Sequence, residues 1–184
     1  MSISSDVQTD VTQRIQQAKQ PATPIAGPYG HPFHPIFVTI PIGAWVASLV
    51  FDIATLVDSN GSQSLVEASY WLIGLGIIGA LVAALFGLMD LIRIPRATRA
   101  RRFGLMHMVL NLTVVGVFAG DFIWRHDTYY EDARVMGGQL TLSIIAIALL
   151  LVSGWIGGML AYRFGVRVAA ERDQMEGYGA AYPS

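Results

Sequence analysis

The sequence lacks cysteine altogether and is poor in charge, since only 14% of its 184 residues are Asp, Glu, Lys or Arg. Without cysteine, disulfide bonds, cysteine-ligated iron–sulfur clusters and covalently attached c-type haem are excluded. Soluble domains carry about 25% charged residues, whereas this chain is 53% hydrophobic. The composition therefore indicates an integral membrane protein.

Four long apolar stretches account for most of this hydrophobicity. They cover about residues 35–57, 70–92, 104–124 and 138–162. Each is close to the roughly 20 residues that a helix needs to cross the hydrocarbon core, and none alternates polar and apolar residues as a barrel strand does. We therefore predict an all-α fold, an integral membrane four-helix bundle formed by residues 31–165.

The basic residues are divided unevenly between the two sides of such a bundle. Ten of the twelve fall in the N-terminal arm, in the loop between the second and third stretches, and after the fourth stretch. By the positive-inside rule, both termini and this loop face the cytoplasm. The expected location is the bacterial cytoplasmic (inner) membrane, in a multi-pass arrangement.

The loop between the second and third stretches is rich in arginine, with Arg96, Arg99, Arg101 and Arg102 close together. Basic clusters at the cytoplasmic boundary bind anionic lipids, and we expect these arginines to hold lipid headgroups or an acidic partner subunit. Nucleic acid is not an expected partner, because the run is a short loop held between two membrane spans.

The segments outside the bundle are short. Residues 1–30 form a cytoplasmic arm that ends in a Pro/Gly-rich linker, and we expect no cleavable signal peptide because the arm has no apolar core. Val7, Val11 and Ile15 recur every four residues, which fits either a short amphipathic helix or a frayed polar arm. Residues 166–184 form a polar cytoplasmic tail that we expect to be disordered when free.

Small residues at helical spacing predict where the helices approach one another closely. The residues expected to pack in this way are Gly79 and Gly87 in the second stretch, Gly116 and Gly120 in the third, and Gly154, Gly157 and Gly158 in the fourth. They predict a tight bundle. Trp45 and Trp155 fall near the middle of their spans, where an indole indicates packing in the core or against a partner.

Polar residues inside the spans are the candidates for chemistry, because ionisable groups at membrane depth are costly and tend to be functional. His31, His34, Asp90, His107 and Asn111 are expected at similar depth near the cytoplasmic side. The imidazoles could ligate a metal ion or a b-type haem, with Asp90 or Asn111 orienting them. The structural alternative is that His34 caps its helix and His107 makes an interhelical hydrogen bond. We expect the protein to bind no cofactor, with a b-type haem or a metal ion as the alternative.

Two further acids, Asp52 and Asp121, are expected near the external helix ends, about 27 Å from His34 along a straight helix. A proton path joining the two layers is conceivable, but few polar residues lie between them. We therefore expect both acids to serve the interface or the packing of the bundle.

Several short motifs occur together in order along the chain. They are Gly30-His31-Pro32-Phe33-His34-Pro35, Phe51-Asp52, Arg99-Ala100-Arg101-Arg102 followed by His107 and Asn111, and Ser153-Gly154-Trp155-Ile156-Gly157-Gly158 with Tyr162-Arg163 and Gly165. In these motifs, residues 30–168 resemble the DUF2231 family of four-helix bacterial membrane proteins. The resemblance implies the fold but no established activity, although some members are fused to Rieske-type domains. Where members often carry Glu and His as potential ligands, this chain has Met159 and Phe164.

The sequence leaves three classes of function open. The first is a non-catalytic accessory subunit of a larger membrane complex. Its expected partners are membrane lipids and other integral membrane subunits, with those of a respiratory complex as the first candidates. The alternative is a haem- or metal-binding redox protein that uses the histidines. A small transporter ranks last, because Pro41 is the only clear kink candidate within a span.

Overall fold

The computed structural model describes residues 5–178 of the chain. Within them lie four helices that are long and apolar enough to cross a membrane. They are formed by α2 and α3 (His34–Phe37 and Thr39–Val57), by α4 (Gln63–Arg93), by α5 (Arg99–Arg125), and by α6 (Gly137–Gly158) with its continuation η2 (Met159–Arg163). The predicted all-α fold with four spans is confirmed.

Two of the helices begin earlier than their apolar stretches do. α4 starts at Gln63 rather than at residue 70, and α5 starts at Arg99 rather than at residue 104. At the second of these ends the Thr98 hydroxyl accepts a hydrogen bond from the Arg101 N–H at 3.1 Å, which is the usual N-cap. Hydropathy marks only the part of a helix that is apolar, so it misses polar first turns.

The first span is interrupted at Val38, between α2 and α3. Pro41 explains the interruption, because a proline lacks the N–H that would bond to the carbonyl four residues earlier and its ring clashes with that carbonyl. The carbonyl concerned belongs to Phe37, the last residue of α2.

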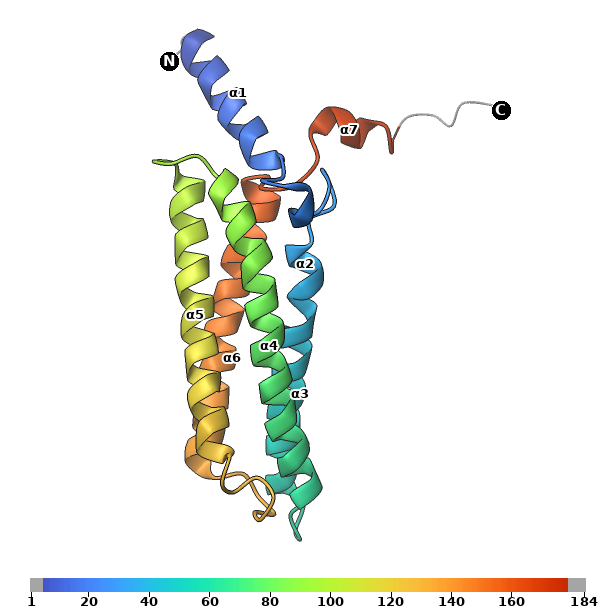
Figure 1. The fold of residues 1–184 in the computed structure, drawn as a ribbon, viewed down its shortest axis with the longest axis vertical. Helices are drawn as coiled ribbons and strands as arrows, with labels where there is room; N and C mark the ends of the chain where they lie inside the picture. The colour runs from blue at the N-terminus through green and yellow to red at the C-terminus, as the bar shows by residue number, and fades with distance from the viewer. Residues whose placement is uncertain (1–4, 179–184) are drawn as a thin grey trace, which may run out of the picture.

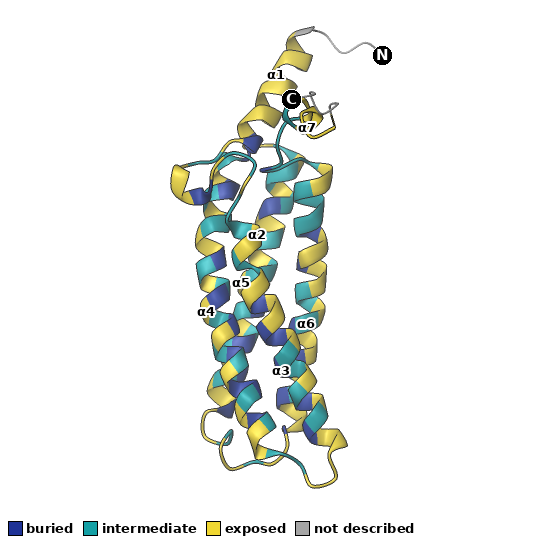
Figure 2. Ribbon diagram, turned by 90° about the vertical axis from the view of Figure 1, so that its right-hand side faces the viewer, coloured by how far each residue is buried: buried dark blue, intermediate teal, exposed yellow. Residues whose placement is uncertain are grey.

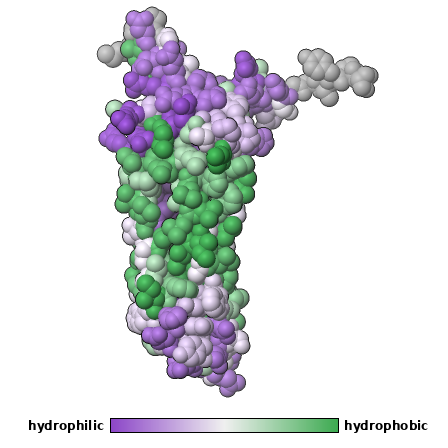
Figure 3. Space-filling view, in the orientation of Figure 1, coloured by the Kyte–Doolittle hydropathy of each residue, from purple (hydrophilic) through white to green (hydrophobic). Residues whose placement is uncertain are grey.

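The four spans form an elongated bundle in which sequence neighbours run antiparallel (Figure 1). α3 packs against α4 and α6, and α5 packs against the same two helices, so α3 and α5 lie diagonally across the bundle. A hydrophobic band covers most of the visible face between two hydrophilic ends (Figure 3). We call the end with the α4–α5 loop the arginine end and the other the opposite end.

The apolar core lies midway along the bundle. It consists of Trp45, Ile73, Val114, Phe118 and Ala146, each at most 2% exposed. The Trp45 ring stacks on Phe118 with centroids 4.4 Å apart, and its indole N–H donates to the Ile73 carbonyl at 3.3 Å. Trp45 is thus a core residue, as its mid-span position predicts.

Glycines of α4 and α6 let large side chains approach the backbone. A Cβ atom on Gly79 would lie 2.7 Å from Ile40, one on Gly87 would lie 2.9 Å from His34, and one on Gly157 would lie 3.0 Å from His107. These three glycines pack as expected.

Four other glycines correct the packing prediction. A Cβ on Gly116, Gly120 or Gly154 would meet nothing within 4 Å, and one on Gly158 would meet only Tyr162 of the same helical run, at 4.0 Å. These residues lie on the outer surface of the bundle. Four-residue spacing identifies a face of small residues but does not say which way the face points.

The arms outside the bundle are ordered where the structure describes them. α1 (Ser5–Lys19) projects beyond the arginine end, and α7 (Glu171–Met175) lies at the same end of the bundle (Figure 1). The N-terminal arm therefore takes the helical alternative. The described part of the tail, residues 166–178, departs from the expected disorder, because Arg167 is 3% exposed and makes the contacts described below. The remainder of the predicted tail, residues 179–184, lies outside the described residues.

Candidate functional site

Two histidines meet at the arginine end of the bundle. His34 opens α2 and His107 lies in α5, and their ring centroids are 6.2 Å apart at an interplanar angle of 89°. Because their helices lie diagonally across the bundle, the two imidazoles point toward each other across its interior. Gly87 and Gly157, on the other two helices, leave room for the rings.

The same ring nitrogen is engaged in both histidines. His34 Nδ1 lies 2.9 Å from the Ala83 carbonyl, and His107 Nδ1 lies 2.9 Å from the Ser153 carbonyl. A carbonyl only accepts, so Nδ1 carries the proton in each ring and Nε2 keeps its lone pair. Asn111 Nδ2 lies 3.2 Å from His107 Nε2 and donates to the Ser153 hydroxyl at 2.7 Å.

The remaining members of the predicted histidine site are elsewhere. His31 is exposed in the loop before α2. Asp90 forms an ion pair with Arg167 at 2.8 Å instead of orienting an imidazole, which corrects its predicted role. Among the described residues no group of three or more His, Asp or Glu is arranged to hold a metal ion. The layer therefore consists of His34, His107 and Asn111.

A second polar layer lies inside the bundle near the opposite end. Arg125, at the end of α5, donates to both carboxylate oxygens of Asp52 at 2.8 Å and to Asp121 Oδ2 at 2.9–3.0 Å. Ser69 of α4 donates to Asp52 at 2.6 Å, and Ser143 of α6 lies 3.3 Å from both acids. We call Asp52, Ser69, Asp121, Arg125 and Ser143 the ion cluster. All five are at most 1% exposed.

The similar depth of Asp52 and Asp121 agrees with the prediction from the sequence, whereas the position of Arg125 between them was not predicted. When the ends of the spans are placed by hydropathy, Arg125 is assigned to the external loop that follows the third span. The signal that identifies it is its spacing from Asp121, because residues four apart share a helix face and an arginine on the face of a buried acid is a candidate partner. Asp52 and Asp121 are thus bound to one guanidinium, and this pairing holds α3 to α5.

The two polar layers are separated by apolar side chains. The core of Trp45, Ile73, Val114, Phe118 and Ala146 lies on the helices between them. Ser48 is buried in this region, but its hydroxyl donates to the Trp45 carbonyl of its own helix at 2.8 Å. The structure therefore gives no support to a proton path that joins the layers.

The arginine loop divides into two kinds of side chain. Arg96, Arg99 and Arg102 are exposed. Arg101 instead donates to the carbonyls of Leu91 and Ile94 at the end of α4, so it caps that helix and is not free to bind lipid. The predicted lipid or partner site is corrected to the three exposed arginines.

The N-terminal arm and the tail are tied together above the bundle. Arg167, whose φ of 62° is rare for a residue with a side chain, donates to the carbonyls of Ala26 and Gly27 at 3.1 and 2.9 Å and pairs with Asp90. Lys19 donates to the carbonyls of Val168 and Ala169. These contacts, made over long sequence separations, fix the tail on α4 and the linker.

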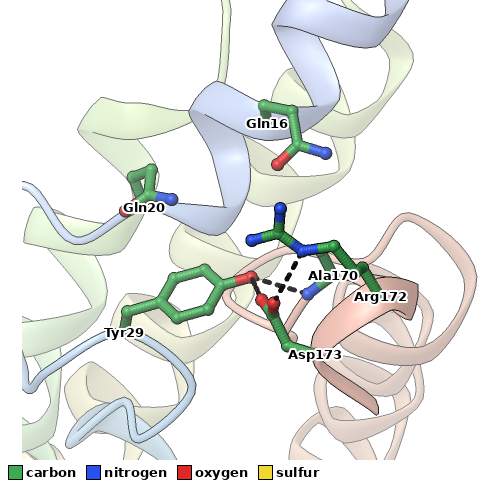
Figure 4. A pocket seen from close by; sticks show the side chains of 6 residues that line it. All are labelled: Gln16, Gln20, Tyr29, Ala170, Arg172 and Asp173. Atoms are coloured by element: carbon green, nitrogen blue, oxygen red, sulfur yellow. Dashed lines mark hydrogen bonds and ion pairs between the residues drawn. The ribbon is translucent and has the colours of Figure 1, made fainter. Parts of the chain in front are cut away.

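A shallow polar pocket of about 400 Å³ lies between the arm and α7 (Figure 4). The Tyr29 hydroxyl donates to Asp173 Oδ2 at 2.7 Å and accepts from the Ala170 N–H at 2.6 Å. The hydrogen bond from Tyr29 lowers the pKa of Asp173, and the same bond raises the pKa of Tyr29. Gln16, Gln20 and Arg172 line the rest of the pocket.

This architecture defines a multi-pass membrane protein built on a four-helix bundle with two internal polar layers. The family model described as "Predicted membrane protein (DUF2231)" matches residues 30–170, which is most of the chain. The chain belongs to this family. No curated protein and no solved structure matches it.

Proposed function

We propose that this protein is a non-catalytic accessory subunit of a larger membrane complex, with a respiratory electron-transfer complex as the first candidate. The observation that carries the proposal is one outer face of α6 and η2 formed by Leu151, Trp155, Gly158 and Tyr162, which we call the α6 face. The aromatic side chains of this face are 75% and 92% exposed. Coloured by burial, the ribbon of α6 carries exposed and half-buried residues along most of its length (Figure 2).

Trp155 is poorly suited to contact lipid alone. It lies about 12 Å along the helix from Arg163, where the span ends, at 1.5 Å per residue. Its indole N–H makes no hydrogen bond within the described part of the chain. Hydrocarbon offers no acceptor for an N–H group, so burial against another protein subunit is favourable. Gly158 lies between Trp155 and Tyr162 on this face, and its small size lets a partner helix approach the backbone.

Two further surfaces support an association role. Val7, Val11 and Ile15 form an apolar stripe on α1 that is 45–52% exposed, as expected of a helix that binds a membrane surface or a partner. Arg96, Arg99 and Arg102 supply positive charge at the arginine end, each worth about 1 kcal/mol near an anionic leaflet. Both surfaces lie at the end of the bundle that carries α1 and α7 (Figure 1).

The test is purification in mild detergent through a tag on a quinol-oxidising or oxygen-reducing complex, followed by mass spectrometry. We expect this chain to co-purify, and we expect Gly158→Leu with Trp155→Ala to abolish co-purification without lowering its thermal stability. Gly43→Leu is the matched control, because a Cβ at Gly43 also meets nothing within 4 Å but lies on α3. Migration of the wild-type chain only as a free monomer or homo-oligomer would refute the proposal.

A b-type haem protein is the second candidate function, favoured by the geometry of His34 and His107. Haem-ligating imidazoles commonly donate a hydrogen bond from the N–H of their second ring nitrogen to a backbone carbonyl, as Nδ1–H does in both rings. His34 and His107 would hold the group through Nε2, which in His107 lies 3.2 Å from Asn111 Nδ2, and a haem would supply one-electron redox chemistry. A visible absorption spectrum with metal analysis of the purified protein separates this candidate from the accessory role.

A further inference from the structure

The ion cluster carries an unbalanced charge in the ionised state. It holds one guanidinium and two carboxyl groups, at most 1% exposed, and Ser69 and Ser143 add only neutral hydroxyls. With both acids ionised, the interior of the bundle would hold one uncompensated negative charge. Such a charge is costly at membrane depth unless a bound cation or a proton neutralises it.

Hydrogen bonds distinguish the two acids. Both oxygens of Asp52 accept from Arg125, and Ser69 adds a further bond at 2.6 Å, so this carboxylate is fully satisfied as an anion. Asp121 accepts from Arg125 through Oδ2 alone, and its Oδ1 is buried without any hydrogen-bond partner. Burying a carboxylate oxygen without a hydrogen-bond partner costs more free energy than burying the same group as a neutral carboxyl.

We propose that the ion cluster is a binding site for one proton, which resides on Asp121 while Asp52 and Arg125 remain ionised. The charged groups that face it are Asp52 from α3 and Arg125 from its own helix, while α4 and α6 contribute Ser69 and Ser143. Proton binding brings the net charge of the cluster to zero. When the proton is released, two carboxylates that repel each other share one arginine. Proton binding is therefore coupled to the strength of the contact between α3 and α5.

The test is infrared spectroscopy of the full-length protein in lipid nanodiscs at neutral pH in sodium-free buffer. We expect a C=O stretching band from a protonated carboxyl group that is absent in Asp121→Asn, whose amide is isosteric with the neutral acid. Asp58→Asn, at an exposed acid, is the matched control and should keep the band. In Asp52→Asn the band should also disappear, because Asp121 then becomes the sole anionic partner of Arg125.

Several outcomes would overturn the proposal. A wild-type spectrum without the band refutes it directly, as does a band that survives in Asp121→Asn. Disappearance of the wild-type band on addition of sodium chloride, but not of choline chloride, would show that a sodium ion competes for the site and that neutralisation by a proton is not specific. If Asp121→Asn does not fold, aspartate labelled with carbon-13 at the side-chain carboxyl must shift the wild-type band, and an unshifted band refutes the assignment.

Discussion

His34 and His107 meet edge to face with ring centroids 6.2 Å apart, although they come from spans that lie diagonally across the bundle. Each ring is held by a backbone carbonyl of a third or fourth helix, Ala83 of α4 and Ser153 of α6. The pair therefore ties all four spans together at one level. This structural role exists whether or not the Nε2 atoms also ligate a haem.

Replacing His107 by alanine removes the hydrogen bond from its Nδ1–H to the Ser153 carbonyl and the contact of its Nε2 with Asn111. We expect the substitution to lower the free energy of unfolding by about 1–2 kcal/mol, the upper part of the range found for hydrogen bonds between membrane helices. Chemical denaturation in detergent measures the change, and His31→Ala, at an exposed loop position, is the control. Loss of a stoichiometric haem or metal from the variant would instead identify the layer as a redox centre.

The glycines of the bundle give a paired prediction. Gly79→Leu forces a side chain against Ile40, so we expect it to lower the stability by about 1–3 kcal/mol, as overpacking does in other proteins. Gly158→Leu points outward and should leave the thermal stability of the isolated protein unchanged in detergent. Equal destabilisation by both substitutions would show that the α6 face packs inside the bundle.

Much of the fold could be predicted from the sequence because bilayer thickness constrains helix length directly. The spans, the mid-span packing of Trp45 and the close approach at Gly79 all follow from apolar length and small-residue spacing. The direction of each helix face does not follow. Gly154 and Gly158 follow the same four-residue spacing as Gly79, Ala83 and Gly87 but face outward, because the spacing of small residues does not distinguish a lipid-facing glycine from a packed one.

The candidate sites divide in the same way. His107 and Asn111 share a helix face by their spacing, so their contact could be predicted, as could the similar depth of His34. Asp90 could not be assigned, because its partner Arg167 lies in a tail that appears polar and unstructured in sequence. Arg125 was hidden by the hydropathy boundary of its own span, where a charged residue is read as the start of a loop.

Membrane orientation is a prediction that rests on charge. α1, α7 and the α4–α5 loop lie at the same end of the bundle (Figure 1), and this end carries most of the arginines. By the positive-inside rule we expect reporter fusions at either terminus and within residues 93–102 to be cytoplasmic. Fusions at Asn60 and Glu131, which lie in the connections at the opposite end, should be external. An external N-terminal reporter would invert the assignment.

The docking of α7 is expected to depend on pH through Tyr29 and Asp173. The pKa of Asp173 is lowered from its ordinary value of 3.8. The ionised carboxylate therefore stabilises the docked α7 above pH 3.8, and this stabilisation is lost as the pH falls through the lowered pKa. The pKa of Tyr29 is raised above its ordinary value of 10.0. The protonated hydroxyl therefore stabilises the docked α7 below pH 10, and this stabilisation is lost as the pH rises through the raised pKa. The contact is therefore fully formed between these two limits.

Hydrogen exchange of residues 170–175, corrected for the intrinsic effect of pH, measures this docking across the acid limit. We expect Tyr29→Phe to raise the exchange rate at neutral pH, because it removes both the donor to Asp173 and the acceptor for the Ala170 N–H. The variant should also lose the additional increase that the wild type shows in acid. Tyr178→Phe is the matched control, since Tyr178 is 91% exposed and should leave exchange unchanged. Wild-type protection in Tyr29→Phe would mean that Arg167 and Lys19 alone hold the tail.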